Sequence, residues 1–167
     1  TFTDGEYFSP LVAATDYKRA YDNNRGPNTG GMGSYSPPDF WSVNLAHQVQ
    51  EDIIRPTLRA LKQEGSPYSG VLYAGLMITS DGPSVLEFNC RLGDPETQVV
   101  LPLLKSSLFE LLWNATEGKL KQTKVISSSQ TAVTVVMVAE GYPGKYKTGM
   151  KIKGLDTVKD RLVFHAG

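Results

Sequence analysis

Hydrophobic residues recur with two different periods along this chain, and the two periods predict different elements. Over residues 41–64 apolar side chains return every three or four positions, which is the spacing of one helix face. Pro56 lies inside this segment, where it is expected to kink the helix or to sit where the local carbonyl points to solvent. Residues 70–79 and 84–89 are rich in β-forming side chains. Asp81-Gly82 between them is a strong signal for a hairpin turn.

Shorter elements are expected on either side of this helix and hairpin. They are opening strands at 1–3 and 7–13, a helix with Asp94 as N-cap and Pro95 as its first residue that Pro102 breaks, a second helix at 107–116, and a strand at 132–139. Residues 15–39 are polar and rich in Gly, Asn and Pro, which predicts a long functional loop.

The order of the expected elements predicts a mixed α/β (α+β) class. The polar segment 119–130 is expected to be a linker, which divides the chain into domains at 1–122 and 123–167. In the second domain the tail 150–167 alternates weakly, and we expect further short strands there.

Composition excludes several kinds of partner. The 17 Lys and Arg residues balance the 17 Asp and Glu residues, so no overall field attracts nucleic acid or a membrane. The apolar runs are too short to span a bilayer. Cys90 is the single cysteine, which favours a reducing compartment such as the cytoplasm. Because the chain starts at Thr1 without an initiator Met, we expect a fragment of a longer protein.

A glycine-rich segment at 26–33 reads GPNTGGMG. Its glycines free the backbone to point several N–H groups at one anion. The spacing matches neither the dinucleotide-binding fingerprint nor a P-loop, and a bare glycine cluster is more typical of a flexible surface turn. Lys18, Arg19 and Arg25 lie close in sequence, and these cations favour a phosphate site.

The end of the predicted hairpin carries a candidate metal pair. Strand alternation places Glu87 and Asn89 on one face and turns Leu86, Phe88 and Cys90 toward the core. One charged and one neutral oxygen ligand suit Mg²⁺, which completes its shell with water and nucleotide phosphates. Taken alone, the pair is more typical of the solvated face of a strand.

The residues that follow strengthen the functional interpretation. Arg91 has the same parity as Asn89, and its planar guanidinium suits phosphate or carboxylate. Gly93-Asp94-Pro95-Glu96 then predicts a tight turn into a helix N-terminus, which favours an anion. Asp94 could simply cap that helix or also hold an amine, and the sequence leaves both roles open.

These motifs resemble those of the phosphoribosylamine–glycine ligase (glycinamide ribonucleotide synthetase) family. The signature is RLGDPETQ at 91–98, and further blocks are DYKR at 16–19, GPNTGGMG at 26–33, YAGL at 73–76 and GYPG at 141–144. The resemblance covers nearly the whole chain. It implies the C-terminal half of an ATP-grasp core, an antiparallel sheet with flanking helices, followed by the start of a small mixed C-terminal domain.

The resemblance also implies an activity. ATP, glycine and 5-phosphoribosylamine would give glycinamide ribonucleotide, ADP and phosphate through a glycyl phosphate, as a step of purine biosynthesis. The cofactors would be ATP and Mg²⁺ or Mn²⁺. The missing parts of the same polypeptide would complete the site. Alternatives are another ATP-grasp carboxylate–amine ligase of purine synthesis and a non-catalytic phosphate-binding module.

Site roles follow from the same resemblance. Glu87 and Asn89 would bind the metal, Arg91 would hold the transferred phosphoryl group or the substrate carboxylate, and Asp94 would lie near the substrate amine. The residues expected near substrate phosphate are Lys18, Arg19, Asn28, Thr29, Gly30, Gly31 and Gly33. One departure from many ATP-grasp enzymes is the absence of an acid in residues 73–77.

Overall fold

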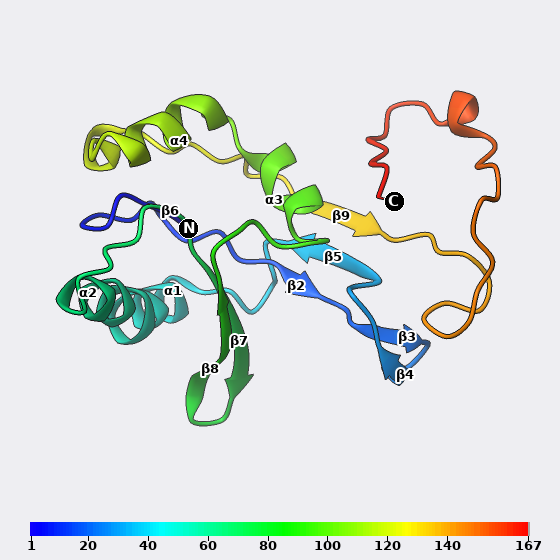
Figure 1. Ribbon diagram of the computed structural model, residues 1–167, viewed down its shortest axis with the longest axis horizontal. Coiled ribbons are helices and arrows are strands. Elements are labelled where there is room, and N and C mark those ends of the chain that lie inside the picture. The colour runs from blue at the N-terminus through cyan, green and yellow to red at the C-terminus, as the bar shows by residue number, and fades with distance from the viewer. Residues whose placement is uncertain (167) are drawn as a thin grey trace.

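A computed structural model describes residues 1–166 of the chain (Figure 1). The strands are β1 (Phe2–Thr3), β2 (Thr15–Asp16), β3 (Arg19–Tyr21), β4 (Arg25–Asn28), β5 (Gly33–Ser36), β6 (Gly70–Val71), β7 (Tyr73–Thr79), β8 (Gly82–Asn89) and β9 (Ala132–Val135). The helices are α1 (Val43–Val49), α2 (Arg55–Gln63), α3 (Thr97–Leu103) and α4 (Leu108–Thr116), with a π-helical segment at Gln50–Ile54 and 3₁₀ turns at Leu120–Gln122 and Leu155–Thr157.

All strand pairs within residues 1–166 are antiparallel, and they form small separate sheets. The order is β1–β6, β2–β5–β9, β3–β4 and β7–β8. Helices flank these sheets, so the predicted mixed α/β class is confirmed. The β7–β8 hairpin projects from the body of the molecule (Figure 1).

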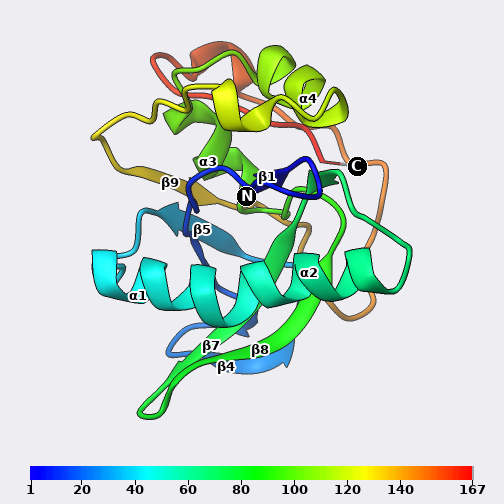
Figure 2. The same cartoon turned by 90° about the vertical axis from the view of Figure 1, so that its left-hand side faces the viewer.

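The predicted helix at 41–64 is confirmed and contains a π-helical segment. Ser42 caps it by accepting a 3.1 Å hydrogen bond from Leu45 N. The π-helical segment Gln50–Ile54 ends two residues before Pro56, which has no N–H to donate to a regular helical bond. The three segments run on as one continuous rod (Figure 2). Its apolar face forms the main core, made of Val49, Ile53, Ile54 and Leu58 packed with Phe8 and Leu72.

The segment 119–130 was expected to be a polar linker, but it contributes to a second, smaller hydrophobic core. Leu120, in the 3₁₀ turn, is fully buried against Phe2 and Leu111, and Val125 packs on the same cluster. Leu120 N also donates to Asp4 Oδ2 at 3.1 Å. This segment therefore packs onto the body, because two of its apolar side chains find partners that are far away in sequence.

Two expectations for the first forty residues are wrong. The strand expected at 7–13 is reduced to a bridge between Thr3 and Phe8, because Pro10 has no N–H for a ladder. The loop expected at 15–39 contains β2, β3, β4 and β5. Strand β5 pairs with β9, which lies about a hundred residues later in the chain, and no local sequence pattern predicts that pairing.

The start of α3 also differs from the expectation. The helix begins at Thr97, so neither Asp94 nor Pro95 belongs to it, and Asp94 Oδ1 instead accepts a 2.7 Å hydrogen bond from Gln98 Nε2. Pro102 lies inside α3, and the helix ends one residue later at Leu103. The second helix, α4, is confirmed, with Ser107 Oγ accepting from Glu110 N at 3.3 Å.

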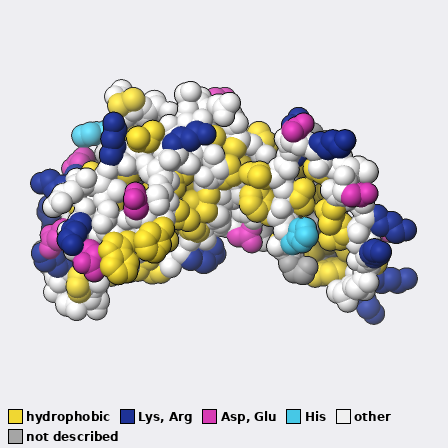
Figure 3. Space-filling model, turned by 90° about the horizontal axis from the view of Figure 1, so that it is seen from above, with side chains coloured by type: hydrophobic (Ala, Val, Ile, Leu, Met, Phe, Trp, Pro, Cys, Tyr) yellow, Lys and Arg dark blue, Asp and Glu magenta, His cyan; other side chains and the backbone are white. Residues whose placement is uncertain are grey.

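The last part of the chain has little regular structure. The strand predicted at 132–139 is confirmed over Ala132–Val135, whereas residues 150–166 contain one 3₁₀ turn and none of the expected short strands. Among residues 1–166 no strand pairs with this segment, and its side chains remain exposed. Apolar side chains accordingly reach the surface over much of the face seen in Figure 3.

Two apolar residues of the hairpin also stay at the surface. Leu86 and Phe88 were expected to face the core, but they are 64% and 40% exposed. Cys90, expected to be buried beside them, is exposed as well. The reason is that the hairpin projects from the body, so within the described residues no layer packs over that side (Figure 1). No helix of residues 1–166 is long and apolar enough to cross a membrane.

Candidate functional site

An open cleft of about 1080 Å³ runs between the β7–β8 hairpin, the β2–β3 segment and the turn before α3. Six of the predicted site residues line it: Lys18, Arg19, Asn28, Thr29, Glu87 and Arg91. Three residues that the sequence analysis did not select as site residues, Asp16, Tyr73 and Glu96, line the same cleft. The tertiary structure therefore brings the glycine-loop region and the signature region to one site.

Glu87 and Asn89 lie side by side at the end of β8, as strand alternation predicts. Asn89 Nδ2 donates to Glu87 Oε1 at 3.0 Å. A register shift in the β7–β8 ladder between Gly75 and Leu76 leaves this parity intact. A side chain at Gly75 would lie 3.0 Å from Glu87 Cγ, so the glycine leaves room for the glutamate.

The chemistry of this pair fits a hard divalent cation. A 180° flip of the Asn89 amide exchanges its Oδ1 and Nδ2. The flipped amide presents its oxygen beside the Glu87 carboxylate, so both side chains can offer oxygen to one cation. Within residues 1–166 no three His, Cys, Asp or Glu side chains form a metal cluster. Such a cation would need water or nucleotide oxygens for most of its coordination shell, as Mg²⁺ usually does in proteins.

The turn before α3 is fastened to the hairpin by one hydrogen bond. Tyr73 Oη donates to Glu96 Oε1 at 2.7 Å, and Glu96 is buried. A side chain on Gly93 would meet Glu96 Oε2 at 2.5 Å, so glycine is needed where Glu96 folds back. Burial, together with this hydrogen bond and the charge of Glu96, raises the pKa of Tyr73, which keeps the hydroxyl protonated as a donor.

The structure separates Arg91 and Asp94. Arg91 lines the cleft and is exposed, with Nη1 donating to the carbonyl of Leu92 at 3.0 Å. Asp94 is exposed and does not line the cleft, because its carboxylate bonds Gln98 on the next turn. Of the two residues expected to act in catalysis, Arg91 therefore has direct access to the cleft.

The glycine segment has internal partners for several of its polar groups. Thr29 donates through both N and Oγ1 to the Lys18 carbonyl, at 2.7 and 2.8 Å, and Thr29 Oγ1 in turn accepts from Gly31 N at 3.1 Å. Gly30 N lies 3.4 Å from Tyr142 Oη. Because these N–H groups are already satisfied, they form no open anion cradle in this conformation.

Two of the glycines allow close packing. A side chain at Gly31 would lie 2.3 Å from Pro95 Cδ, and one at Gly33 would lie 2.8 Å from the Thr134 carbonyl. Gly31 thus lets the loop touch the signature turn, and Gly33 lets β5 pair closely with β9. Neither contact was expected from the sequence, since Pro95 and Thr134 are distant along the chain.

A buried carboxylate lies where the β2–β3 segment enters the cleft. Asp16 is paired with Lys18, whose Nζ is 2.9 Å from Asp16 Oδ2. Burial raises the pKa of Asp16, Lys18 opposes this rise, and the charges of Glu96 and Asp94 add to it. The same pair raises the pKa of Lys18. Arg19 also lines the cleft, and its Nη1 donates to the Gly26 carbonyl at 2.7 Å.

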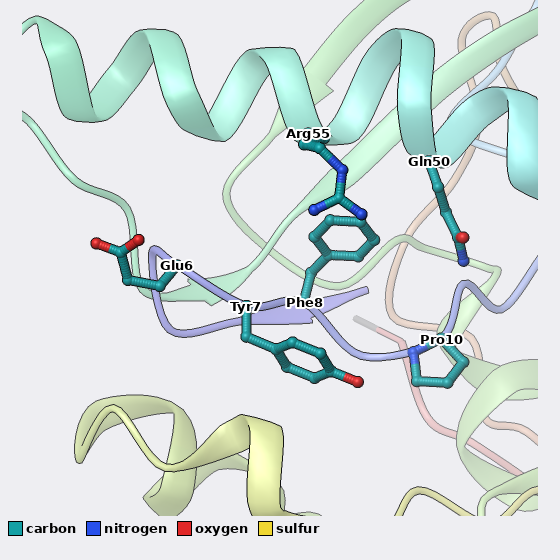
Figure 4. Close-up of a pocket in the computed structure, with 6 residues that line it drawn as sticks. All are labelled: Glu6, Tyr7, Phe8, Pro10, Gln50 and Arg55. Carbon is teal, nitrogen blue, oxygen red and sulfur yellow. The ribbon is translucent and has the colours of Figure 1, made fainter.

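A second hollow, of about 240 Å³, lies against α2 (Figure 4). It is lined by Glu6, Tyr7, Phe8, Pro10, Gln50 and Arg55. Arg55 is held by bonds of 2.9 to 3.2 Å to Glu51 and lies 5.2 Å above the Phe8 ring. Because its cation is already engaged twice, this hollow offers no free binding group comparable to those of the main cleft.

Comparison with known families agrees with this geometry. The family model described as phosphoribosylglycinamide synthetase, ATP-grasp (A) domain, matches residues 1–97, and that of the C domain of the same synthetase matches residues 132–167. The chain is therefore an ATP-grasp protein. More narrowly, it belongs to the phosphoribosylglycinamide synthetase family.

Individual relatives show how much of such a protein this chain represents. It is 49% identical over 166 residues to a phosphoribosylamine–glycine ligase of Caldanaerobacter subterraneus, covering 99% of this chain and 40% of that protein. It is 52% identical over 169 residues to a trifunctional purine biosynthetic protein adenosine-3 of Gallus gallus, covering 99% of this chain and 17% of that protein.

A solved structure shows the same fold. The crystal structure of a phosphoribosylamine–glycine ligase from Thermotoga maritima matches with a TM-score of 0.75 at 38% identity, over 86% of this chain and 36% of that one. The chain thus spans about two fifths of the length of the separate ligases that it matches.

Proposed function

We propose that this chain is part of a phosphoribosylamine–glycine ligase, which joins glycine to 5-phosphoribosylamine with hydrolysis of ATP to ADP and phosphate. Family membership supports this, as do the names of the relatives. The observation that carries the proposal is the Glu87–Asn89 pair, whose Glu87 lines the cleft together with Lys18 and Arg91. The expected location is the cytoplasm, without a nucleic-acid or membrane partner.

The chemistry requires activation of a carboxylate. A free carboxylate is a poor electrophile, so one of its oxygens is first phosphorylated by ATP, which gives ADP and an acyl phosphate. The neutral amine then attacks the acyl carbon, and inorganic phosphate leaves. Phosphoryl transfer depends on positioning and on neutralised charge more than on covalent catalysis. Arg91 supplies a guanidinium at the cleft for the transferred group or the carboxylate, and Lys18 adds a second cation.

Glu87 and Asn89 would hold Mg²⁺ or Mn²⁺, which would neutralise the phosphate charge when bound. Lys18, Arg19, Asn28 and Thr29 line the cleft and are the candidates to bind substrate phosphate. Gly30, Gly31 and Gly33 would act by shaping the loop. Asp94 would reach the substrate amine only after releasing Gln98.

We further propose that residues 1–122 belong to the ATP-grasp core, that residues 123–167 begin the family's C-terminal domain, and that other parts of the same polypeptide complete the nucleotide site. This proposal is supported by the comparison with the separate ligases, of which this chain covers only 40% and 39% of the length. It predicts that the 167-residue chain alone has no ligase activity.

The test is ADP formation by the full-length polypeptide and by the isolated chain. We expect ADP release from the full-length protein only when glycine, 5-phosphoribosylamine and Mg²⁺ are all present. Absence of that dependence would contradict the proposed reaction. Activity of the isolated chain would contradict the proposed need for the remaining polypeptide.

A further inference from the structure

Asp16 is an unusual side chain because it is buried and its ion-pair partner, Lys18, makes no well-aligned hydrogen bond to it. Its side chain is 8% exposed, and neither carboxylate oxygen has solvent access or a hydrogen bond of acceptable geometry. Buried polar groups in folded proteins are nearly always satisfied, and an exception calls for an explanation. One cation does touch it: Lys18 Nζ, 2.9 Å from Oδ2.

The surroundings of Asp16 are negative and face the cleft. Asp16 and Glu96 both line the cleft, and Glu96 is 7% exposed. Tyr73 donates its hydroxyl to Glu96, which leaves no donor there for Asp16. Gly31 packs closely beside Asp16, since a Cβ at Gly31 would lie 3.0 Å from Asp16 Oδ1 and 2.3 Å from Pro95 Cδ.

Lys18 and Asp16 differ in how easily each can leave their ion pair. The Lys18 side chain is 51% exposed and can swing into solvent, whereas Asp16 is held in the wall of the cleft. The present position of Nζ shows that a primary ammonium fits against Asp16 Oδ2. A primary ammonium from a ligand would make the same contact with the same charge, so the exchange leaves no uncompensated carboxylate.

We propose that Asp16, with Glu96 beside it, binds the primary ammonium of the amino-acid substrate, and that the Lys18 ammonium occupies this place until the substrate displaces it. This rests on the proposed ligase function. The glycine ammonium carries a full positive charge, which suits two buried acids. The amine of 5-phosphoribosylamine suits them less well, because it must be neutral to attack. Displaced from Asp16, Lys18 becomes free to contact an anionic group in the cleft.

A small ammonium is favoured over a metal ion at this place. Lys18 already places an ammonium 2.9 Å from the buried Asp16 Oδ2, so a donor of that kind fits there.

The experiment compares steady-state kinetics of full-length proteins carrying Asp16→Asn, Asp16→Glu or the exposed control Asp22→Asn. We expect Asp16→Asn to raise the KM for glycine roughly 10- to 100-fold, the range for a charged hydrogen bond. The KM for ATP should stay within about 2-fold, as a specific subsite requires. Asp16→Glu should recover part of the glycine affinity, and Asp22→Asn should match the wild type.

The outcomes separate this inference from the proposed function. A wild-type protein without glycine-dependent ADP release would reject the function itself. An active wild type with an unchanged glycine KM in Asp16→Asn would overturn the ammonium site. A rise confined to the KM for 5-phosphoribosylamine would overturn its assignment to the amino acid.

A second measurement covers the case in which Asp16→Asn does not fold. Glycine alone, added to the wild-type full-length protein, should increase acetylation of Lys18 by acetic anhydride relative to the exposed Lys151, as measured by mass spectrometry. The reason is that displacement from Asp16 releases Nζ. Unchanged relative labelling of Lys18 at saturating glycine would overturn the exchange.

Discussion

Tyr73 and Glu96 join the strand next to the metal pair to the turn of the signature, through a 2.7 Å hydrogen bond from the phenol to the carboxylate. Tyr73 is also the register partner of Asn89 across the hairpin. The bond therefore fixes the signature turn relative to Glu87 and Asn89. A substitution at Tyr73 should change both the geometry of the site and the stability of the protein.

Tyr73→Phe should destabilise the protein by about 1–3 kcal/mol, because Glu96 would remain buried without its donor. Urea denaturation measures this change. Tyr21→Phe is the matched control, since Tyr21 is exposed and should change stability by less than about 0.5 kcal/mol. Equal effects of the two substitutions would show that the bond contributes nothing.

Neighbouring glycines should respond differently to alanine. Gly31→Ala places Cβ 2.3 Å from Pro95 Cδ at a φ of +134°, and we expect a loss of about 1–3 kcal/mol. At Gly30 the nearest atom would be Tyr142 Oη at 3.9 Å, so Gly30→Ala should be neutral or stabilise by up to about 1 kcal/mol. Thermal unfolding of both variants checks the contrast, and an equal loss would mean that loop flexibility, not packing against Pro95, governs this segment.

Metal dependence should change at Glu87 and Asn89. In the full-length protein, Glu87→Gln and Asn89→Leu should each lower kcat roughly 100-fold or more and raise the Mg²⁺ concentration needed for half activity. The exposed Ser84→Ala on the same strand serves as the control. A Mg²⁺ titration identical to that of the wild type would place the metal elsewhere.

The stability of the wild type should depend on pH through Asp16. Its pKa is raised in the folded state, mainly by burial, so folding favours the protonated form. The resulting stabilisation is fully present below the unfolded pKa of about 3.9 and is lost as pH rises through the higher folded value. Lys18, Glu96 and Asp94 are the charged groups that act on it.

Asp16→Asn removes this titration. Its stability relative to the wild type should therefore be greatest near pH 7 and should shrink toward pH 4, as measured by urea midpoints at both pH values. Asp22→Asn should show no such trend. A variant that loses stability at pH 7 would show that ionised Asp16 holds the fold together, contrary to the expectation for a buried carboxylate without a hydrogen bond.

The sequence by itself determined the elements whose signals are local. The helix at 41–64 follows from apolar spacing, the hairpin from β-rich runs around a turn, and the adjacency of Glu87 and Asn89 from strand alternation. These features depend on the backbone periods of 3.6 and 2, which neighbouring residues fix without help from the rest of the molecule. The signature at 91–98 likewise indicated the family that the comparisons show.

Only the tertiary structure decided which side chains meet. The pairing of β5 with β9, the burial of Leu120, and the exposure of Leu86 and Phe88 depend on which distant segments pack together or leave a face uncovered. The same is true of Asp16: the sequence points to its neighbours Lys18 and Arg19 as the phosphate-binding residues. Burial beside Gly31, Glu96 and Pro95 makes it the unsatisfied acid of the cleft, because desolvation is a property of the assembled fold.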